Sequence, residues 1–191
     1  MLETSFSLLE RLRLSSDSAA WQRLVELYSP YIHSWLRRQS LQSADVEDLT
    51  QEVLRSVVAA LPDFQHDLRR GAFRRWLRTI TVNHLRSFWR VRRPQTLTKD
   101  TEMLLDQLED PASDLSLLWD EEHDRHVVRR LLGWIQGEFE PTTWRAFQLV
   151  VLEGRSAGEA AAELGISANA ARIAKSRVLA RLRQESDGLI D

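Results

Sequence analysis

Apolar residues recur every three or four positions along most of the chain, a spacing that places them on one face of an α-helix. The first run consists of Trp21, Leu24, Tyr28, Tyr31 and Trp35. Ser16 stands where a side chain can cap this helix, and Pro30 is expected to bend or divide it because proline lacks a backbone donor. The run predicts a helix with one buried face.

Two further runs predict helices in the same half of the chain. The second run is Val46, Leu49, Val53, Val57 and Leu61, which follows Ser43 and stops at Pro62. The third run is Phe73, Leu77, Ile80, His84 and Phe88, between Gly71 and Arg92, and Pro94 ends it. Both runs have polar residues on the opposite side, so we expect amphipathic helices.

The C-terminal part of the chain carries signals for helix ends. Helices are expected near 125–134 and 142–152, and Pro141 suits the opening turn of the second. Ser156 and Glu159 form a capping box, Gly165 allows a sharp turn, and Ser167 caps the last helix. Two capped helices joined by a glycine-containing turn predict a helix-turn-helix.

Between these parts, from residue 95 to 124, the periodicity fades and acidic residues accumulate. We expect a linker there that can contain short helical turns. Since no strand pattern of useful length occurs, the predicted fold class is all-α, with two small helical domains joined by an acidic linker. The predicted boundaries are 1–94, 95–124 and 125–191, and the last domain contains the helix-turn-helix.

Charge is distributed unevenly along the chain. The formal net charge is −2, but residues 64–93 sum to +8 and residues 94–153 sum to −8. The flanking segments are close to neutral, at −3 for 1–63 and +1 for 154–191. Because salt screens charges beyond about 10 Å, the local field of 64–93 decides whether a polyanion binds there.

Composition excludes several classes of protein. There is no cysteine, which excludes disulfides and thiolate zinc sites and suits a reducing cytoplasm. No uninterrupted apolar run approaches the roughly 20 residues that span a bilayer, and the N-terminus lacks the pattern of a signal peptide. We therefore expect a cytoplasmic protein without membrane insertion.

The helix-turn-helix offers a candidate surface for duplex DNA. Its second helix would lie in the major groove, with donors on the outward side. These candidates are Ser167, Asn169, Arg172, Lys175, Ser176 and Arg177. The alternative is an ordinary helical hairpin with a solvated face.

Residues 63–93 combine arginines with the aromatic residues Phe64, Phe73, Trp76, Phe88 and Trp89. Such a helix can bind a single strand, because aromatic rings stack on unpaired bases and arginines neutralise the backbone. The predicted polar stripe is Thr79, Asn83, Arg86 and Arg90, with Arg75 and Arg78 beside it. Alternatively the aromatic residues form a core, as we expect for Phe73 and Phe88, and the arginines are solvated.

The helix over 43–58 has an acidic outer face. Asp48 and Glu52 stand one turn apart, a spacing that suits a metal, an acid/base pair or a surface for a basic partner. His123 and His126 are likewise a weak zinc motif. With no further ligand cluster in support, we predict no catalytic residue, no metal and no cofactor.

Taken in order, DLTQE at 48–52, FRRWLRTITVN at 73–83 and LGIS at 164–167 resemble a bacterial RNA polymerase sigma factor of the extracytoplasmic-function class. The resemblance covers roughly residues 5–185. It implies that core polymerase binds Asp48, Leu49, Gln51, Glu52 and Arg55. It also implies that the minus-ten promoter element binds Arg75, Trp76, Arg78, Thr79, Asn83, Arg86 and Arg90.

The same resemblance assigns the minus-thirty-five element to the last helix, and places the linker near the RNA path in the polymerase. Some positions depart from the family pattern. Ser87 stands where an acid is usual, and Ala170, Ala171, Ala174 and Lys175 differ from the common residues of the last helix. These departures weaken any inference about promoter sequence, because alanine offers bases no hydrogen bond. Whether an anti-sigma factor binds the chain stays open.

Three other interpretations compete with this one. A two-domain helix-turn-helix regulator that acts without joining polymerase explains 154–183 but leaves the two earlier stretches unassigned. A helical enzyme would use Asp48 and Glu52 with a divalent metal. A structural adaptor would show no salt-dependent binding to nucleic acid.

Overall fold

A computed structural model of the chain describes residues 7–14, 18–39, 41–64, 71–92 and 98–190. Ser16 and Pro94, expected to cap one helix and to end another, lie outside these residues. The chain divides into two compact units. Of the described residues, those up to 127 together with 187–190 form one, here called the N-terminal unit, and residues 128–186 form the other, the C-terminal unit.

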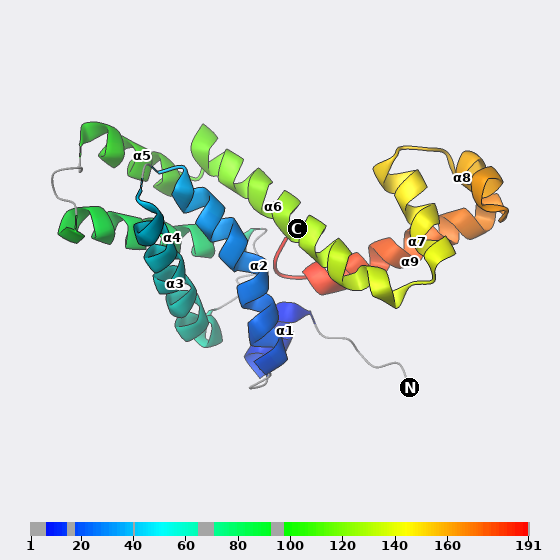
Figure 1. The fold of residues 1–191 in the computed structure, drawn as a ribbon, viewed down its shortest axis with the longest axis horizontal. Helices are drawn as coiled ribbons and strands as arrows, with labels where there is room; N and C mark the ends of the chain where they lie inside the picture. The colour runs from blue at the N-terminus through cyan, green and yellow to red at the C-terminus, as the bar shows by residue number, and fades with distance from the viewer. Residues whose placement is uncertain (1–6, 15–17, 40, 65–70, 93–97, 191) are drawn as a thin grey trace. The chain divides into compact units, whose positions relative to one another are not determined.

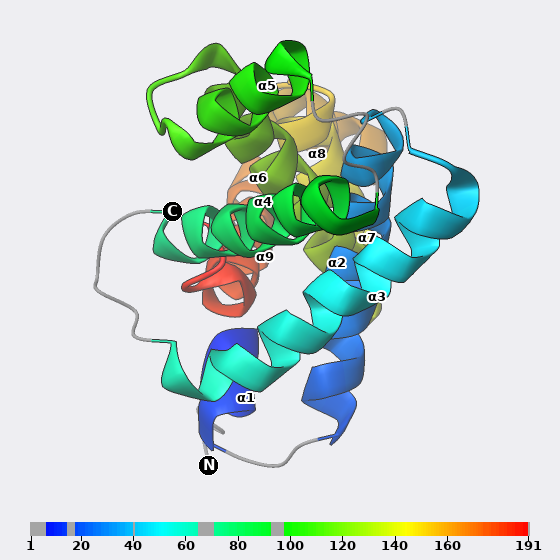
Figure 2. The same cartoon turned by 90° about the vertical axis from the view of Figure 1, so that its left-hand side faces the viewer.

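The N-terminal unit is built from helices (Figures 1 and 2). They are α1 (Leu8–Leu14), α2 (Ser18–Arg37), α3 (Ser43–Ala60), the 3₁₀ turn η1 (Leu61–Asp63), α4 (Ala72–Arg92), α5 (Lys99–Glu109) and the first part of α6 (Asp114–Ile135). Helix α3 packs against both α2 and α4, and α5 lies along α4 (Figure 2). The three helices expected from the periodic runs are thus confirmed.

The predicted apolar stripes form the core of this unit. Leu24, Leu49, Val53 and Leu77 are completely buried. Pro30 does not divide α2, which continues through it from Ser18 to Arg37. One missing donor is tolerated because the buried neighbours Tyr28, Tyr31 and Ile32 hold both halves against the core.

Residues 98–124 differ from the expected linker, since they are largely helical. Helix α5 has Thr98 as its N-cap, whose hydroxyl accepts a hydrogen bond from the Thr101 amide at 3.3 Å. Leu105, Leu108 and Trp119 are almost fully buried. Burial of these few large apolar side chains stabilises the helices despite the many acids between them.

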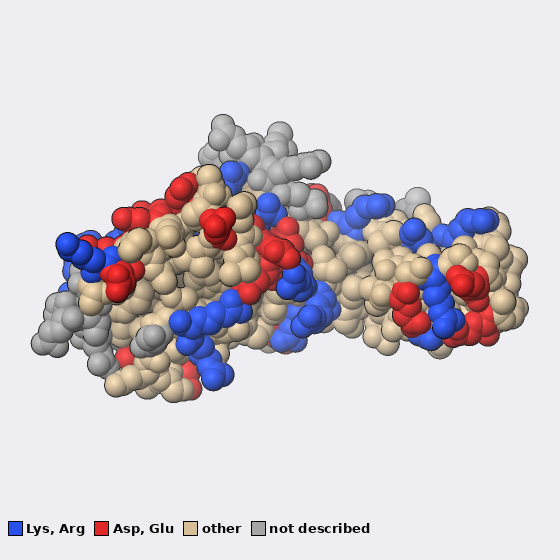
Figure 3. Space-filling model, turned by 90° about the horizontal axis from the view of Figure 1, so that it is seen from above, with Lys and Arg blue, Asp and Glu red and all other residues tan. Residues whose placement is uncertain are grey.

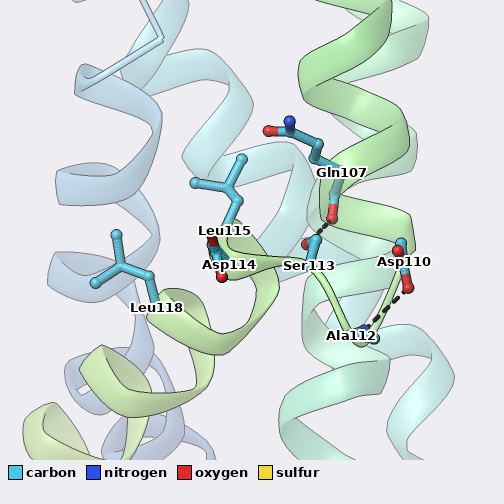
Figure 4. A pocket seen from close by; sticks show the side chains of 7 residues that line it. All are labelled: Gln107, Asp110, Ala112, Ser113, Asp114, Leu115 and Leu118. Carbon is cyan, nitrogen blue, oxygen red and sulfur yellow. Dashed lines mark hydrogen bonds between the residues drawn. The ribbon is translucent and has the colours of Figure 1, made fainter.

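Side-chain hydrogen bonds define the corner between α5 and α6 (Figure 4). Ser113 Oγ donates to the Gln107 carbonyl, and Asp110 Oδ1 accepts from the Ala112 amide at 2.9 Å. Ser116 Oγ reaches the same Gln107 carbonyl at 3.0 Å. An open pocket of about 690 Å³ lies at this corner and includes Leu118 in its lining. The bonds fix α5 and α6 as a hairpin.

The C-terminal unit contains the last part of α6, the 3₁₀ turn η3 (Gln136–Glu138), α7 (Pro141–Phe147), the π-helical turn η4 (Gln148–Leu152), α8 (Ala157–Leu164) and α9 (Ala168–Ser186). Its core has two buried clusters. Small residues such as Ala160, Ala171 and Ala174 pack where α8 meets α9, and Trp144, Phe147 and Val178 pack between α7 and α9.

The predicted helix ends in this unit are confirmed. Ser156 and Glu159 form the capping box of α8, and Gly165 has the left-handed φ of 65° that glycine adopts without strain. Ser167 Oγ accepts a hydrogen bond from the Ala170 amide at 3.1 Å, as an N-cap of α9 does. Pro141 begins α7. Local side-chain chemistry therefore specifies this helix-turn-helix.

The all-α class is confirmed. Over the described ranges the chain forms no strand, and the one isolated β-bridge joins Asp187 to Ile190. None of the helices in those ranges has the length and apolar character needed to cross a membrane.

Candidate nucleic-acid interface

Helix α4 presents part of the predicted polar stripe to solvent. Thr79, Asn83 and Arg90 are exposed, four and seven residues apart, on one side of the helix. Thr79 Oγ1 donates to the Arg75 carbonyl at 3.0 Å, and Arg75 is itself partly exposed. We call Arg75, Thr79, Asn83 and Arg90 the open face of α4. It offers hydrogen-bond donors and positive charge to a ligand.

One aromatic ring adjoins this open face. Trp76 is partly exposed, and its ring lies 4.7 Å from that of Phe64 and 5.5 Å from that of Phe73, centroid to centroid. The other aromatic residues of the stretch, Phe64, Phe73, Phe88 and Trp89, are buried. Stacking on bases is therefore available to Trp76 alone among these five, and the expectation of a core position holds for Phe73 and Phe88.

The structure corrects the prediction for Arg78, which does not lie on an accessible face. Its side chain is 5% exposed, and its Nη1 forms an ion pair with Asp120 Oδ1 at 2.7 Å. The same nitrogen donates to the Ser116 carbonyl at 3.2 Å. Burial lowers the pKa of Arg78, and the Asp120 carboxylate opposes that shift. In this conformation, Arg78, which was predicted to bind DNA, binds α6 instead.

Arg74, which was not among the residues predicted to bind DNA, shares this contact. Its Nη1 lies 2.7 Å from Asp124 Oδ2, and its Nε lies 3.3 Å from Asp120 Oδ2. Asp120 therefore bridges two arginines of α4, one with each carboxylate oxygen. The only sequence feature that pointed to Arg74 was its position in the arginine-rich stretch 63–93.

Arg86 is also paired. It donates to Glu109 of α5 and lies 3.8 Å from Asp106 Oδ1. The hydrogen bond between the two side chains raises the pKa of Arg86 and lowers that of Glu109. Arg86, Arg90, Glu102, Leu105 and Asp106 line a small pocket of about 220 Å³ between the two helices. Arg86 thus belongs to the α4–α5 contact, unlike the neighbouring Arg90.

The first half of α6 is anchored on α2. Trp119 is completely buried, with its ring 4.5 Å from that of Trp35 and 5.1 Å from that of Tyr31. Tyr31 Oη donates to the Trp119 carbonyl at 2.9 Å. Arg38 forms an ion pair with Glu122 at 2.8 Å on the outer side. The acids of α6 are therefore held at a defined position over α4.

The histidines considered as zinc ligands belong to this anchor. His123 is completely buried, with Nδ1 2.9 Å from Asp124 and Nε2 3.2 Å from the Tyr28 hydroxyl. Burial lowers the pKa of His123, although Asp124 opposes the shift. His126 Nε2 lies 2.6 Å from the Leu27 carbonyl. Both rings thus make hydrogen bonds that join α6 to α2.

Helix α3 exposes most of its predicted polar residues. Asp48, Gln51 and Arg55 are exposed, and Glu52 is partly buried, with one oxygen 3.7 Å from His84 Nδ1. Leu49 is the exception, because it is completely buried in the core. The prediction that Leu49 contacts a partner is corrected: its side chain positions α3 and is not accessible in this conformation.

Helix α9 exposes all six predicted candidates. Ser167, Asn169, Arg172, Lys175, Ser176 and Arg177 face solvent, whereas Ala171, Ala174 and Val178 are buried. Across the described part of the chain, Arg172, Lys175 and Arg177 have no acidic partner within ion-pair distance. This face combines positive charge with a capped helix N-terminus, which suits an anion.

The remaining basic residues near α8 are neutralised locally. Arg155 pairs with Glu163, and Arg145 lies 2.6 Å from Glu153 and 3.2 Å from Glu163. Figure 3 shows one face of the molecule, on which basic and acidic side chains lie beside one another. The basic residues left for a polyanion are therefore fewer than the sequence count implies.

Helices α3 and α4 lie in a segment that is similar to known proteins. Residues 24–95 match the family model for sigma-70 region 2, a segment that includes both helices. The chain is 28% identical over 174 residues to RNA polymerase sigma factor CnrH of Cupriavidus metallidurans, and the match covers 85% of each chain. The segment that carries α3 and α4 is therefore a sigma-70 region 2 domain.

Two solved structures are also similar to this chain. The RsbN–BldN complex contains a chain 20% identical to it, with a TM-score of 0.37 and coverage of 92% of this chain and 97% of the other. CnrH in complex with the cytosolic domain of CnrY gives 23% identity, a TM-score of 0.38 and coverage of 92% of each chain. The resemblance to a sigma factor predicted from the order of the motifs is confirmed by the region 2 match and the similarity to CnrH.

Proposed function

We propose that this sigma factor divides promoter recognition among three surfaces. The exposed side of α3 binds core RNA polymerase, the open face of α4 with Trp76 captures unpaired bases of the minus-ten element, and α9 reads the minus-thirty-five element as duplex. This role in transcription initiation requires the protein in the cytoplasm. It assigns no catalytic step to the chain.

The observation that carries the proposal is the combination on α4 of a partly exposed ring with exposed polar groups. Trp76 offers a face for stacking, which is worth about 1–3 kcal/mol per base. Asn83 and Arg90 lie further along the helix and offer donors for base edges and phosphates. A flipped base exposes its Watson–Crick edge to such donors, whereas a paired base does not.

The exposed side of α3 suits a protein partner better than DNA. Asp48 and the partly exposed Glu52 are acidic, so this helix repels phosphate and attracts a basic surface. Gln51 and Arg55 add hydrogen-bonding groups along the same side. Binding there leaves the exposed Thr79, Asn83 and Arg90 of α4 available for the promoter.

Helix α9 suits duplex DNA because Arg172, Lys175 and Arg177 project from it with Asn169 near its start. A helix of this kind fits the major groove, where side-chain donors reach bases and phosphates. Alanines occupy several positions along it, so base-specific contacts are few. We infer weak binding by this surface alone and useful binding once polymerase holds the promoter nearby.

The alternative of a regulator that acts without polymerase is not favoured. The region 2 match includes α3 and α4, which that alternative leaves unexplained. The enzyme hypothesis gains no support from geometry, since the described residues hold no group of three or more metal-ligating side chains. Asp48 and Glu52 act instead, in this proposal, as part of the polymerase surface.

Run-off transcription with purified core polymerase and a library of promoter fragments tests the proposed function. We expect the chain to bind core polymerase and to direct initiation from a subset of fragments that share minus-ten and minus-thirty-five sequences. Co-purification separates this function from that of an independent regulator. Failure to form a holoenzyme, with the chain folded by circular dichroism, would contradict it.

A further inference from the structure

Four carboxylates of α5 and α6 face three arginines of α4. Asp106 and Glu109 contact Arg86 from α5. Asp120 and Asp124 contact Arg74 and Arg78 from α6. We call the carboxylates the acidic cover and Arg74, Arg78 and Arg86 the covered arginines.

The cover resembles a nucleic-acid backbone in its chemistry. Guanidinium groups pair with carboxylates and phosphates in the same forked geometry, so one ligand excludes the other. Asp120 places its two oxygens on two different arginines, as a bridging phosphate does. DNA that approaches α4 must therefore compete with carboxylates already held at 2.7 Å from Arg74 and Arg78.

The two parts of the cover are held with different strength. The α5 part is exposed, because the side chains of Asp106 and Glu109 are 76% and 44% accessible. The α6 part is attached to the buried Trp119 and His123, so its removal exposes large apolar surface. DNA alone cannot readily displace the α6 part, whereas a large polymerase interface supplies enough binding energy to do so.

We propose that α5 and the first half of α6 form an intramolecular acidic cover that withholds the covered arginines from promoter DNA in the free chain and is displaced in the holoenzyme. This inference rests on the proposed function of α4. The open face remains accessible throughout, so the free chain retains weak, mainly non-specific binding to single strands. Displacement of the cover adds up to three phosphate contacts when polymerase is bound.

The α5 part offers the cleaner test because its acids are exposed. The variant carries Asp106→Asn and Glu109→Gln, which release Arg86 without touching the core. The matched control carries Asp100→Asn on α5 and Asp114→Asn on α6, which change the net charge by the same amount. Among the described side chains, neither Asp100 nor Asp114 forms an ion pair with an arginine of α4. A second pair, Asp120→Asn against Glu121→Gln, tests the α6 part.

The measurement is binding of a fluorescent oligothymidylate to the free chain and to the holoenzyme as salt is varied. For the free chain we expect on the order of tenfold tighter binding by the cover variants than by their controls. The slope of log affinity against log salt should also steepen by about 0.7 for each arginine released. In the holoenzyme, cover and control variants should bind equally.

The outcomes separate the inference from the function it rests on. Equal binding by cover and control variants of the free chain, with a holoenzyme that still opens promoters, overturns the cover and leaves the function intact. An advantage of the cover variants that persists unchanged in the holoenzyme overturns displacement by polymerase. If the wild-type chain does not assemble a holoenzyme, or the holoenzyme does not open promoters, the proposed function itself is contradicted.

Discussion

Arg78 of α4 and Asp120 of α6 form an ion pair at 2.7 Å, with the arginine side chain 5% exposed. The pair joins α4, which we propose binds the promoter, to α6, whose first half lies in the segment predicted to be a linker. A charge so buried is stable only while its partner is present, because it cannot regain water. While α6 is docked on α4, Arg78 is therefore not accessible to a ligand.

Removal of the Asp120 carboxylate is expected to destabilise the N-terminal unit. Asp120→Ala leaves Arg78 buried without its ion pair, which should cost about 3 kcal/mol in the free energy of unfolding. Glu121→Ala, one residue away, removes only an exposed pair with Arg125 and should change that energy by about 0.5 kcal/mol or less. Urea denaturation followed by circular dichroism measures both. Equal effects would show that the pair does not hold α6.

Acid should weaken the docking of α6 through His123. Burial lowers the pKa of this histidine below its ordinary value of 6.5, so the docked segment favours the neutral ring. The unfolded segment takes up a proton as pH falls below 6.5 and the docked one does not, so stability is complete above that pH and declines below it. The decline can reach about 1.4 kcal/mol per pH unit.

His123→Gln should flatten this pH dependence, because glutamine does not titrate. His33→Gln, on the partly exposed side of α2, serves as the control and should retain the wild-type profile. The midpoint of urea unfolding between pH 7.5 and pH 5.5 measures the difference. A wild-type profile in the His123 variant would exclude this ring as the cause.

Charge reversal on the exposed side of α3 should weaken polymerase binding. Asp48→Arg replaces an exposed acid with a bulky cation, and the affinity for core polymerase should fall by about tenfold or more. Glu26→Arg makes the same charge change on an exposed position of α2 and should have little effect. Surface plasmon resonance with immobilised core polymerase compares them. Indistinguishable affinities would remove α3 from the interface.

The exposed basic residues of α9 should contribute more to promoter binding than Arg155, which precedes α8. Arg177→Ala removes an exposed cation and should reduce initiation at promoters that depend on a minus-thirty-five element, lowering the salt slope by about one contact. Arg155→Ala removes a cation already paired with Glu163 and should change initiation little. Salt titrations of run-off transcription distinguish the two. A larger loss for the Arg155 variant would point to a different DNA-binding face.

Much of this fold follows from short-range patterns, and the exceptions share a physical cause. The capping box of Ser156 and Glu159 and the turn at Gly165 depend on residues close in sequence, so they were predictable. The buried position of Leu49 was also implied by its place in an apolar run. Arg78 was not predictable in the same way, because its partner Asp120 lies 42 residues away and only tertiary packing brings them together.

The hairpin of α5 and α6 was missed for a related reason. Its acids dominate the composition and obscured the spacing of Leu105, Leu108 and Trp119, which are the residues that fix its position. The roles of individual site residues in binding polymerase and promoter stay predictions. The exposure of Asn83 and Arg90 is consistent with these roles, whereas Arg86 is paired with Glu109.

Permanganate footprinting of promoter opening shows whether α4 captures unpaired bases of the minus-ten element, because permanganate reacts with unpaired thymines. The decisive variant combines Asn83→Ala with Arg90→Ala, two exposed changes that leave the ring contacts of Trp76 with Phe64 and Phe73 intact. Ser87→Ala, exposed on the same helix, is the control. We predict normal holoenzyme assembly and strongly reduced thymine reactivity for the double variant alone. Full reactivity in that variant, with assembly equal to the control, would contradict the account.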